Sequence, residues 1–563
     1  MGTNITHADK SFRKLDSAAF VGGLWIVFTL GLVIAVSAVE LLMGLPVNAL
    51  TFPIALVAPP FLLMLYSERR TLLRAAVAVS LLWASTLLIG SFTFDYSHDG
   101  YFYHQESIFS FFQGDNLYLH PGKYDHCVWV LHYAKGMELI AANLMALTGN
   151  IESGKAANFM LGMASAMILW HIAGGMSRKQ KVVLIGLVLA NPVYLSQLFT
   201  YYIDFVSYFL IILTISLTVA LYRGLPRSLC LAGLAVVIEL SAAVKFNAFF
   251  FEGLTILAVL IWIWWKDGLG SRLFKSLLIT SLLAAAVSAC VVCWHPYITN
   301  IITHGHPLYP LMGEGKMDIM TDNTPEMYFV NDRVTSFLYS YFIPHPAHSP
   351  TVYDTRFGGF GIFSFLLFPI AIATLVYYPV RNRRMDAIAY TALCVIVSAF
   401  IFEQSWWARY IPQVWLLVPL SYLYLCRQWK KFARYVRGVL TLLAVATAAI
   451  VLWVDFSFVL PTCSDRTTIA KVFSGKTIRV YDYDDHGLDI MRRTGITPVP
   501  MPSDSLSEDA HVIAFYTPAV RERIRYYMLM EVTEEELELY ENEREKRSIS
   551  TIMKSMFKNN REQ

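Results

Sequence analysis

Long apolar runs separated by short polar turns fill the chain between residues 18 and 460. A helix needs about 20 apolar residues to cross a bilayer, because each residue rises about 1.5 Å and the hydrocarbon core is about 30 Å thick. The runs predict about 13 transmembrane helices. Their expected bounds are residues 18–42, 49–66, 71–92, 156–176, 182–200, 203–222, 228–246, 247–265, 276–294, 358–379, 387–404, 408–425 and 438–460. The first run is too long for a signal peptide and lacks a cleavage site, so we expect it to be retained.

Basic residues gather in every second turn between these runs. With the N-terminus in the cytoplasm, all the short basic turns fall on the inner side, as the positive-inside rule requires. These turns hold Lys10, Arg13, Lys14, Arg69, Arg70, Arg74, Arg178, Lys179, Lys181, Arg223, Arg227, Lys266, Arg272, Lys275, Arg381, Arg383, Arg384, Arg427, Lys430, Lys431, Arg434 and Arg437. Two long loops, about residues 93–155 and 295–357, then lie outside and hold few basic residues, such as Lys123 and Arg356. The pattern predicts a multi-pass protein of the cell (inner) membrane.

The end of the chain changes in character after residue 461. KTIRVYDY and HVIAFY alternate like strands, HGLDIMRRTG is typical of a helix ending at Gly495, and Thr533 with Glu536 predicts a helix cap. We therefore expect an all-α polytopic membrane bundle with a small C-terminal α/β domain. Residues 1–17 would be a cytoplasmic tail, 18–460 the transmembrane domain and 461–563 an extracytoplasmic domain. The short apolar segment after Lys135, MELIAANLMALTG, predicts an interfacial or re-entrant helix.

Composition supports the membrane class and narrows the functions. The chain is 56% hydrophobic and 15% charged, whereas soluble proteins carry about 25% charged residues. Its net charge of +3 is too small to indicate nucleic-acid binding. Neither a phosphate-binding G-x-x-x-x-G-K-[ST] loop nor a dinucleotide G-x-G-x-x-G unit occurs, which argues against a nucleotide site. Cys290 and Cys293 form a C-x-x-C within an apolar run, where two small core residues are the simpler interpretation.

The densest group of polar residues begins where the third predicted span ends. The segment FDYSHDGYFYHQESI, residues 94–108, holds Asp95, His98, Asp99, Tyr103, His104 and Glu106. Ionisable groups at the mouth of an apolar bundle are functional candidates, and a carboxylate there can act as a general base. A helix starting near residue 99 would bring Asp99, Tyr103 and Glu106 to one face. The alternative is that these acids serve only the solubility of an outer loop.

A second candidate motif is WWARYIP, residues 406–412, at the outer end of a late span. Arg409 carries a forked set of donors that suits a phosphate group. The alternative is an aromatic and basic anchor at the membrane interface. Asp204, in NPVYLSQLFTYYID, is either a second acid of the site or a helix-start residue, and Lys245 either holds an anionic donor or snorkels.

A third motif, HPYITNIITHGHPLYPLMG, opens the second long loop at residue 295. Its histidines, His295, His304 and His306, have no acidic residue interleaved with them, so the sequence does not favour a metal site. We expect no cofactor, with a divalent metal ion as the alternative.

Together these segments resemble the GT-C superfamily of integral-membrane glycosyltransferases, which use polyprenyl-phosphate-linked sugars. The resemblance covers most of residues 18–460 and rests on FDYSHDGYFYHQ, HYAKGMELIAANLMALTG, NPVYLSQLFTYYID and WWARYIP. It implies a catalytic acidic residue in the first outer loop, here Asp99 with Asp95 as the rival. It also implies a late arginine on the donor phosphate, here Arg409. The second outer loop lacks the acidic pair of metal-dependent relatives.

The resemblance implies a membrane enzyme that transfers a sugar from a polyprenyl-phosphate donor to a lipid, glycan or protein acceptor, with inversion at the anomeric carbon. The donor phosphate would be bound by Arg409, Lys245 and His104. The acceptor pocket would be lined by Tyr103, Glu106, Asp204 and His295. The alternatives are a polysaccharide polymerase or ligase and a transporter or flippase, although the chain shows no internal repeat of the kind that many transporters have.

Overall fold

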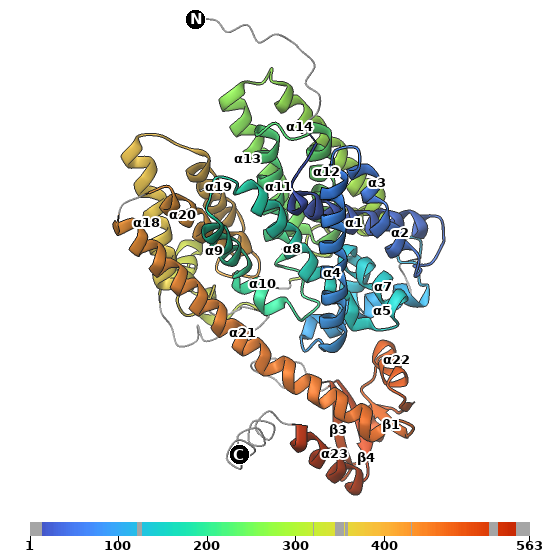
Figure 1. The fold of residues 1–563 in the computed structure, drawn as a ribbon. Helices are drawn as coiled ribbons and strands as arrows, with labels where there is room; N and C mark the ends of the chain where they lie inside the picture. Colours follow the sequence, from blue (N-terminus) through green and yellow to red (C-terminus); the bar gives the residue numbers. More distant parts are fainter. Residues whose placement is uncertain are drawn as a thin grey trace, which may run out of the picture.

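The structure, a computed structural model, describes residues 14–547 except 121–126, 319, 322, 344–353, 355–358, 429–430 and 517–526. Figure 1 shows a helical bundle with a small α/β domain below it. The first part of the bundle contains α1 (Ala18–Leu42), α2 (Thr51–Val57), α3 (Pro59–Leu63), α4 (Arg69–Phe92), α8 (Ala156–Ile172), α9 (Arg178–Leu189), α10 (Pro192–Gln197), α11 (Val206–Tyr222), α12 (Arg227–Val244), α13 (Phe246–Asp267) and α14 (Arg272–Val287). The second part contains α18 (Ser364–Asn382), α19 (Ala387–Ile401), η7 (Pro412–Leu416), α20 (Leu417–Cys426) and α21 (Lys431–Phe473).

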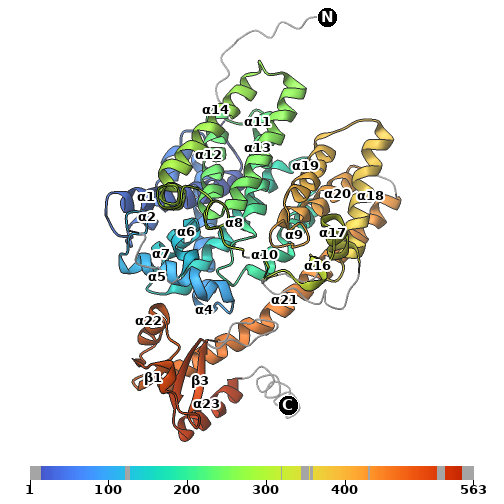
Figure 2. The ribbon, with the colours of Figure 1, turned by 180° about the vertical axis from the view of Figure 1, so that it is seen from behind.

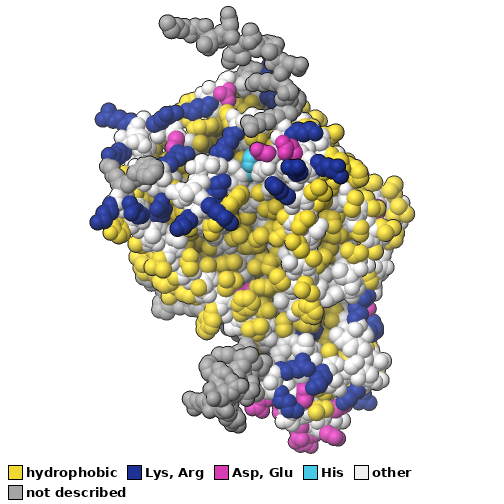
Figure 3. Space-filling view, in the orientation of Figure 1, with side chains coloured by type: hydrophobic (Ala, Val, Ile, Leu, Met, Phe, Trp, Pro, Cys, Tyr) yellow, Lys and Arg dark blue, Asp and Glu magenta, His cyan; other side chains and the backbone are white. Residues whose placement is uncertain are grey.

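The predicted fold class is confirmed. Every predicted span coincides with one or more helices, and within the described residues seven helices are long and apolar enough to cross a membrane. Basic side chains gather at the end of the molecule opposite the C-terminal domain, and a broad apolar surface lies between the two ends (Figure 3). This separation matches the predicted alternation of basic turns and long outer loops.

Two predicted spans are broken helices. The segment predicted as 49–66 divides at Pro59 into α2 and α3, and the segment predicted as 182–200 divides at Pro192 into α9 and α10. Proline has no N–H to donate and fits the first turn of a helix, so each proline starts a new helix. The Asn191 side chain caps the second break by accepting a hydrogen bond of 2.9 Å from the Val193 N–H.

The first outer loop folds into short helices packed against the bundle. They are η1 (Gly100–Gln105), a π-helical turn, α5 (Glu106–Gln113), α6 (Val128–His132), α7 (Gly136–Thr148) and η3 (Ile151–Lys155). The predicted interfacial helix is α7, which is buried within the protein from Gly136 to Met145. A Cβ atom at Gly136 would lie 2.8 Å from the carbonyl oxygen of Ala243, so glycine allows α7 to pack closely on α12.

The π-helical turns η4 (Ser288–Val292) and η5 (Trp294–Ile298) lead into the second outer loop, which contains α15 (Thr299–His304), α16 (Glu326–Phe329) and α17 (Arg333–Phe342). Figure 2 shows α16 and α17 against the group formed by α18, α19 and α20. Tyr328 of α16 stacks on Trp406 with ring centroids 4.3 Å apart, and the Ser340 hydroxyl of α17 donates to the Trp406 carbonyl at 2.7 Å. The second loop therefore supports the segment that carries WWARYIP.

The C-terminal domain is carried by α21, a helix of 43 residues. The predicted domain boundary at residue 461 lies inside this helix. The domain contains β1 (Thr477–Tyr481), α22 (Asp485–Arg493), β2 (Thr497–Pro500), η8 (Ser503–Ser505), β3 (His511–Tyr516), β4 (Tyr527–Val532) and α23 (Glu534–Arg547). The strand order is β2-β1-β4-β3, with β1 parallel to β2 and antiparallel to β4. The predicted cap is confirmed, because Thr533 and Glu536 exchange two hydrogen bonds at 2.9 and 3.2 Å.

Candidate functional site

Arg409 lies at the centre of a cluster of ionised side chains. Its Nη2 is 3.3 Å from Asp99, its Nε is 3.1 Å from Asp204, and its Nη1 is 3.3 Å from Asp354. Lys245 Nζ lies 2.5 Å from the other oxygen of Asp204. We call these five residues the ionic cluster. Three carboxylates and two cations meet here, so the carboxylates outnumber the cations.

The ionic cluster forms where several helices end on the side of the C-terminal domain. Asp99 precedes η1, Asp204 lies in the turn between α10 and α11, and Lys245 joins α12 to α13. Arg409 lies in the turn between α19 and η7. Gln197 of α10 donates a hydrogen bond of 3.1 Å to Asp204, which holds this carboxylate in place. Side chains that are far apart in the sequence therefore meet at one end of the bundle.

Aromatic rings surround the two cations. The Arg409 guanidinium carbon lies 4.7 Å from the ring centroid of Tyr202, 5.2 Å from that of Trp407 and 5.5 Å from that of Tyr410. Lys245 Nζ also lies 5.5 Å from the Tyr410 ring. Cations attract the faces of aromatic rings, most strongly where water is excluded. The rings therefore help to hold both cations, and their apolar faces line the site.

Exposure differs sharply among the carboxylates. The side chains of Asp99 and Asp354 are 22% and 19% exposed, whereas that of Asp204 is 1% exposed. Burial alone would raise the pKa of Asp204, but the charges of Arg409 and Lys245 outweigh burial and lower it. Asp204 is therefore a fixed counter-ion, while Asp99 and Asp354 are the acids that a ligand can reach.

Asp99 is ionised and held as an ion pair. Burial opposes its ionisation, but a contact of 3.4 Å with His98 Nδ1 and the charge of Arg409 lower its pKa. The charges of the carboxylates in turn outweigh burial at Arg409 and raise its pKa. A group that takes Arg409 away from Asp99 would remove one of the causes of the low pKa and leave a stronger base.

Asp95, the rival acid, lies in a different network. It is fully buried, and its carboxylate accepts hydrogen bonds from the Ser97 N–H at 2.7 Å, the Ser97 hydroxyl at 2.6 Å and the Tyr201 N–H at 2.9 Å. Burial raises its pKa to about 6, against the opposing charge of Lys155. Its Oδ2 would lie 2.0 Å from a Cβ atom at Gly100, so this carboxylate packs directly against the turn that follows Asp99. This position is suited to a structural role, in which Asp95 supports the turn at Gly100.

The other predicted residues take different places. The Tyr103 ring lies 4.2 Å from that of His104 and 6.3 Å from that of Tyr133, and burial together with the charge of Asp99 raises its pKa. His104 Nδ1 lies 2.7 Å from Glu138, and both side chains are buried. Tyr103 and His104 are thus both near enough to Asp99 to interact with it electrostatically.

Glu106 and His295 interact with other residues of the two outer loops. The charge of Glu106 acts on Cys127 and Lys135 of the same loop. His295 is buried, and its Nδ1 lies 3.1 Å from the Thr299 hydroxyl. Their predicted place in an acceptor pocket stays a prediction.

Sequence reasoning missed two partners of Arg409. Asp354 lies in a loop that has no recognisable motif, and nothing in the sequence indicated it. Tyr202 lies within the motif NPVYLSQLFTYYID, two positions before Asp204, and this proximity in the sequence could have indicated it as a site residue. Across the part of the chain that the structure describes, no group of three or more His, Cys, Asp or Glu side chains is arranged to hold a metal ion.

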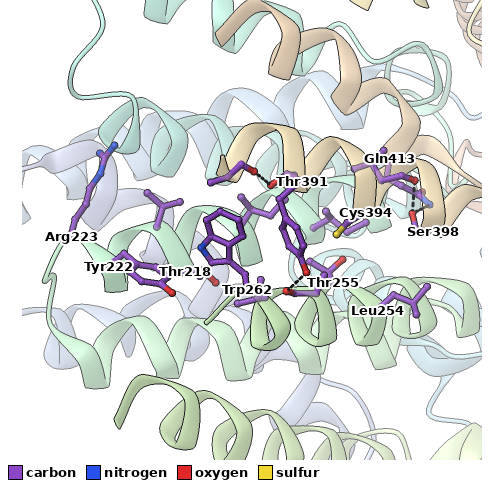
Figure 4. Close-up of a pocket in the computed structure, with 18 residues that line it drawn as sticks. Thr218, Tyr222, Arg223, Leu254, Thr255, Trp262, Thr391, Cys394, Ser398 and Gln413 are labelled. Carbon is purple, nitrogen blue, oxygen red and sulfur yellow. Dashed lines mark hydrogen bonds between the residues drawn. The ribbon is translucent and has the colours of Figure 1, made fainter. Parts of the chain in front are cut away.

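A cavity of about 340 Å³ lies between α11, α13, α19 and η7 (Figure 4). One end is marked by Arg223 and Tyr222, and the other by Ser398 and Gln413, whose side chains are 3.4 Å apart. Most of the lining is apolar, with Thr255 among the few hydroxyl groups between the ends. None of the ionic cluster residues lines this cavity, but Gln413 follows Arg409 by only four positions.

Comparison with known proteins gives one likeness. No family model and no curated protein matches the chain. Among solved structures, the crystal structure of ArnT from Cupriavidus metallidurans bound to undecaprenyl phosphate covers 81% of this chain and 97% of its own, with 12% sequence identity and a TM-score of 0.46.

Proposed function

We propose that this chain is an integral-membrane glycosyltransferase that moves a sugar from a polyprenyl-phosphate-linked donor to a lipid, glycan or protein acceptor on the extracytoplasmic face. The observation that carries the proposal is the contact between Arg409 and Asp99 at the end of the bundle that holds the C-terminal domain. It joins a cation suited to phosphate and a reachable carboxylate in one aromatic-lined site. The N-terminus and the basic turns would lie in the cytoplasm.

Arg409 and Lys245 would bind the donor phosphate. A guanidinium binds phosphate through two parallel N–H donors, and such contacts gain strength where water is excluded. Asp204 would hold both cations in position, because it contacts each of them and is itself fixed by Gln197. When the bond from the anomeric carbon to the phosphate oxygen breaks, negative charge grows on the phosphate, and the two cations would stabilise it.

Asp99 would act as the general base. When the donor phosphate binds the Arg409 guanidinium in place of Asp99, Asp99 would lose its ion pair and its pKa would rise. Donor binding would therefore itself make Asp99 a stronger base. The acceptor hydroxyl or amine would attack the anomeric carbon from the face opposite the phosphate and give its proton to Asp99. The electrons of the broken carbon–oxygen bond would go to polyprenyl phosphate as the leaving group. One displacement of this kind inverts the anomeric carbon.

The cavity in Figure 4 would hold the first part of the polyprenyl chain. Gln413 lines it and belongs to η7, which follows directly on the turn that carries Arg409. The cavity lies among apolar helices of the bundle, and its lining is mostly apolar, as a hydrocarbon chain requires. A donor with its phosphate on Arg409 would therefore find an apolar path toward the inner side.

The proposed function is tested with Asp99→Asn in purified full-length protein, by measuring donor binding and sugar transfer side by side. We expect transfer to fall about 10²- to 10⁴-fold, because a general base is lost. Donor affinity should be kept or rise by up to about fivefold, because Asp99 no longer competes for Arg409 and a partly exposed ion pair contributes about 0.2–1 kcal/mol. Glu314→Gln, an exposed acid of the second outer loop, is the matched control and should change neither quantity.

Other outcomes have definite meanings. Surviving transfer in Asp99→Asn would reject Asp99 as the base and direct attention to Asp95 or Glu106. A wild-type protein that binds polyprenyl-phosphate sugars and moves them across vesicles without transfer would favour the flippase alternative. Extension of a growing glycan by many units would favour the polymerase alternative.

A further inference from the structure

The side chain of Tyr101 lies in the hydrophobic core of the C-terminal domain. Tyr101 belongs to η1 of the first outer loop, yet it is 1% exposed, and every other member of this core comes from residues 469–540. Its ring centroid lies 4.6 Å from that of His486 on α22. A residue of the outer loop thus completes the core of a domain that begins more than 350 positions later.

Gly487 of α22 shows how close this contact is. A Cβ atom at this position would lie 2.6 Å from the Tyr101 hydroxyl oxygen and 2.1 Å from the Met528 sulfur. Any side chain there would collide with the tyrosine or with the core beneath it. Glycine at 487 therefore allows the tyrosine ring to reach into the domain.

Further contacts join the same two parts of the chain. Arg493 of α22 donates a hydrogen bond of 3.2 Å to the Gly149 carbonyl, and its guanidinium carbon lies 4.8 Å from the Phe112 ring centroid. Arg466 of α21 lies 5.8 Å from the Phe94 ring centroid. The C-terminal domain thus contacts the first outer loop near its beginning, its middle and its end.

Tyr101 stands two positions from Asp99 and two from Tyr103. Residues two apart in a helical turn point to different sides, whereas residues four apart share a side. Asp99 contacts Arg409, and Tyr103 lies beside Asp99. The same turn therefore presents its acid to the ionic cluster on one side and is held by the C-terminal domain on the other.

We propose that the C-terminal domain is part of the catalytic site, because insertion of Tyr101 into its core fixes η1 and so places Asp99 against Arg409. Tyr101 is a positioning residue, and Gly487 leaves the space on the domain that its side chain occupies. The catalytic consequence rests on the proposed function, but the fixing of η1 does not. The alternative role for the domain, recognition of the acceptor alone, would leave η1 unaffected when the contact is broken.

The experiment compares Tyr101→Ala, Tyr101→Phe and Gly487→Val with wild type in the full-length protein. Hydrogen–deuterium exchange of the backbone amides of residues 98–104 is measured first, because it needs no turnover. We expect exchange in this segment to rise at least about tenfold in Tyr101→Ala and Gly487→Val, with α1 and α8 unchanged, because a local contact is lost without global unfolding. Tyr101→Phe keeps the ring and should exchange like wild type.

Sugar transfer and donor binding are measured on the same samples. We expect the two disruptive variants to lose about 100-fold in transfer rate while donor binding is kept, because a small misplacement of a reacting group has an effect of this size. Tyr483→Ala removes an exposed tyrosine of the same domain and is the matched control. Gly487→Val breaks the contact from the other side, so an unfolded Tyr101→Ala protein would not prevent the test.

Wild-type exchange in residues 98–104 of both disruptive variants would overturn the proposal, whatever the enzyme transfers. Raised exchange with undiminished transfer would overturn the catalytic part. A wild-type protein without transfer activity would reject the proposed function, and the exchange measurement would still decide whether Tyr101 fixes η1.

Discussion

Replacing Arg409 by lysine separates the charge of this side chain from its shape. The guanidinium presents three different nitrogens to three different carboxylates at 3.1–3.3 Å. A lysine ammonium is a single point of charge and cannot reproduce a fork that spans three acids. Asp204 would still have Lys245 and Gln197, so the loss falls mainly on Asp99 and Asp354.

The magnitude follows from exposure. Both acids have side chains about one-fifth exposed, so each lost ion pair is worth about 0.5–1 kcal/mol rather than the value of a buried pair. We expect the free energy of unfolding to fall by about 1–2 kcal/mol and the protein to remain folded. The effect on catalysis should be larger, because loss of one donor to a developing oxyanion typically lowers kcat about 10²- to 10³-fold.

The assay measures donor binding, steady-state transfer and thermal unfolding of Arg409→Lys in the same detergent. Arg333→Lys is the matched control, because Arg333 is an exposed arginine of the second outer loop that donates to the Phe400 carbonyl. Transfer by Arg409→Lys at the wild-type rate would refute the assignment of Arg409 to the donor phosphate. Loss of folding in this variant alone would show that the ionic cluster is chiefly structural.

Three further predictions concern the surroundings of the site. The pKa of Asp95 is raised to about 6 in the folded state, so its neutral form is favoured by folding. As pH falls from 7 to 5, wild type should gain about 1.3 kcal/mol of stability relative to Asp95→Asn in thermal or denaturant unfolding, and parallel stability curves for the two proteins would contradict this. Gly100→Ala should lower the free energy of unfolding by about 1–3 kcal/mol, because its Cβ would lie 2.0 Å from Asp95 Oδ2, whereas Gly253→Ala meets nothing within 4 Å and should be neutral or stabilising. Thr255→Trp fills the cavity of Figure 4 and should weaken binding of long-chain polyprenyl phosphates but leave the affinity for short-chain analogues unchanged; equal effects on both would contradict the proposed path of the chain.

The helices of the bundle could be predicted because bilayer thickness demands long apolar runs. The breaks at Pro59 and Pro192 were missed, because the spans were predicted from the length of the apolar runs and not from residues that favour the start of a helix. The signal was present at the second break, because Asn191 before Pro192 is a favourable start of a helix.

The candidate site was predictable only in its local parts. Asp99 and Arg409 stood out because ionised groups are rare at the mouth of an apolar bundle. The contact of Asp204 with both cations joins segments about 40 and 200 positions apart, and no pattern along the chain encodes such a pairing. Asp95 and Asp99 could not be separated by sequence, because the choice depends on which carboxylate turns toward Gly100 and which toward Arg409.

Helix α21 continues from the bundle into the C-terminal domain over 43 residues, with Pro461 inside it. An α-helix of this length spans about 65 Å, roughly twice the thickness of the hydrocarbon core of a bilayer. The connection between the bundle and the domain is therefore helical and not a flexible linker. A continuous helix fixes both the distance of the domain from the bundle and its rotation about the helix axis. One residue inserted near position 465 would turn the domain by about 100° about this axis and move it by about 1.5 Å along it. Gly487 would then no longer face Tyr101. The spacing between membrane and domain should therefore tolerate substitutions far better than insertions or deletions.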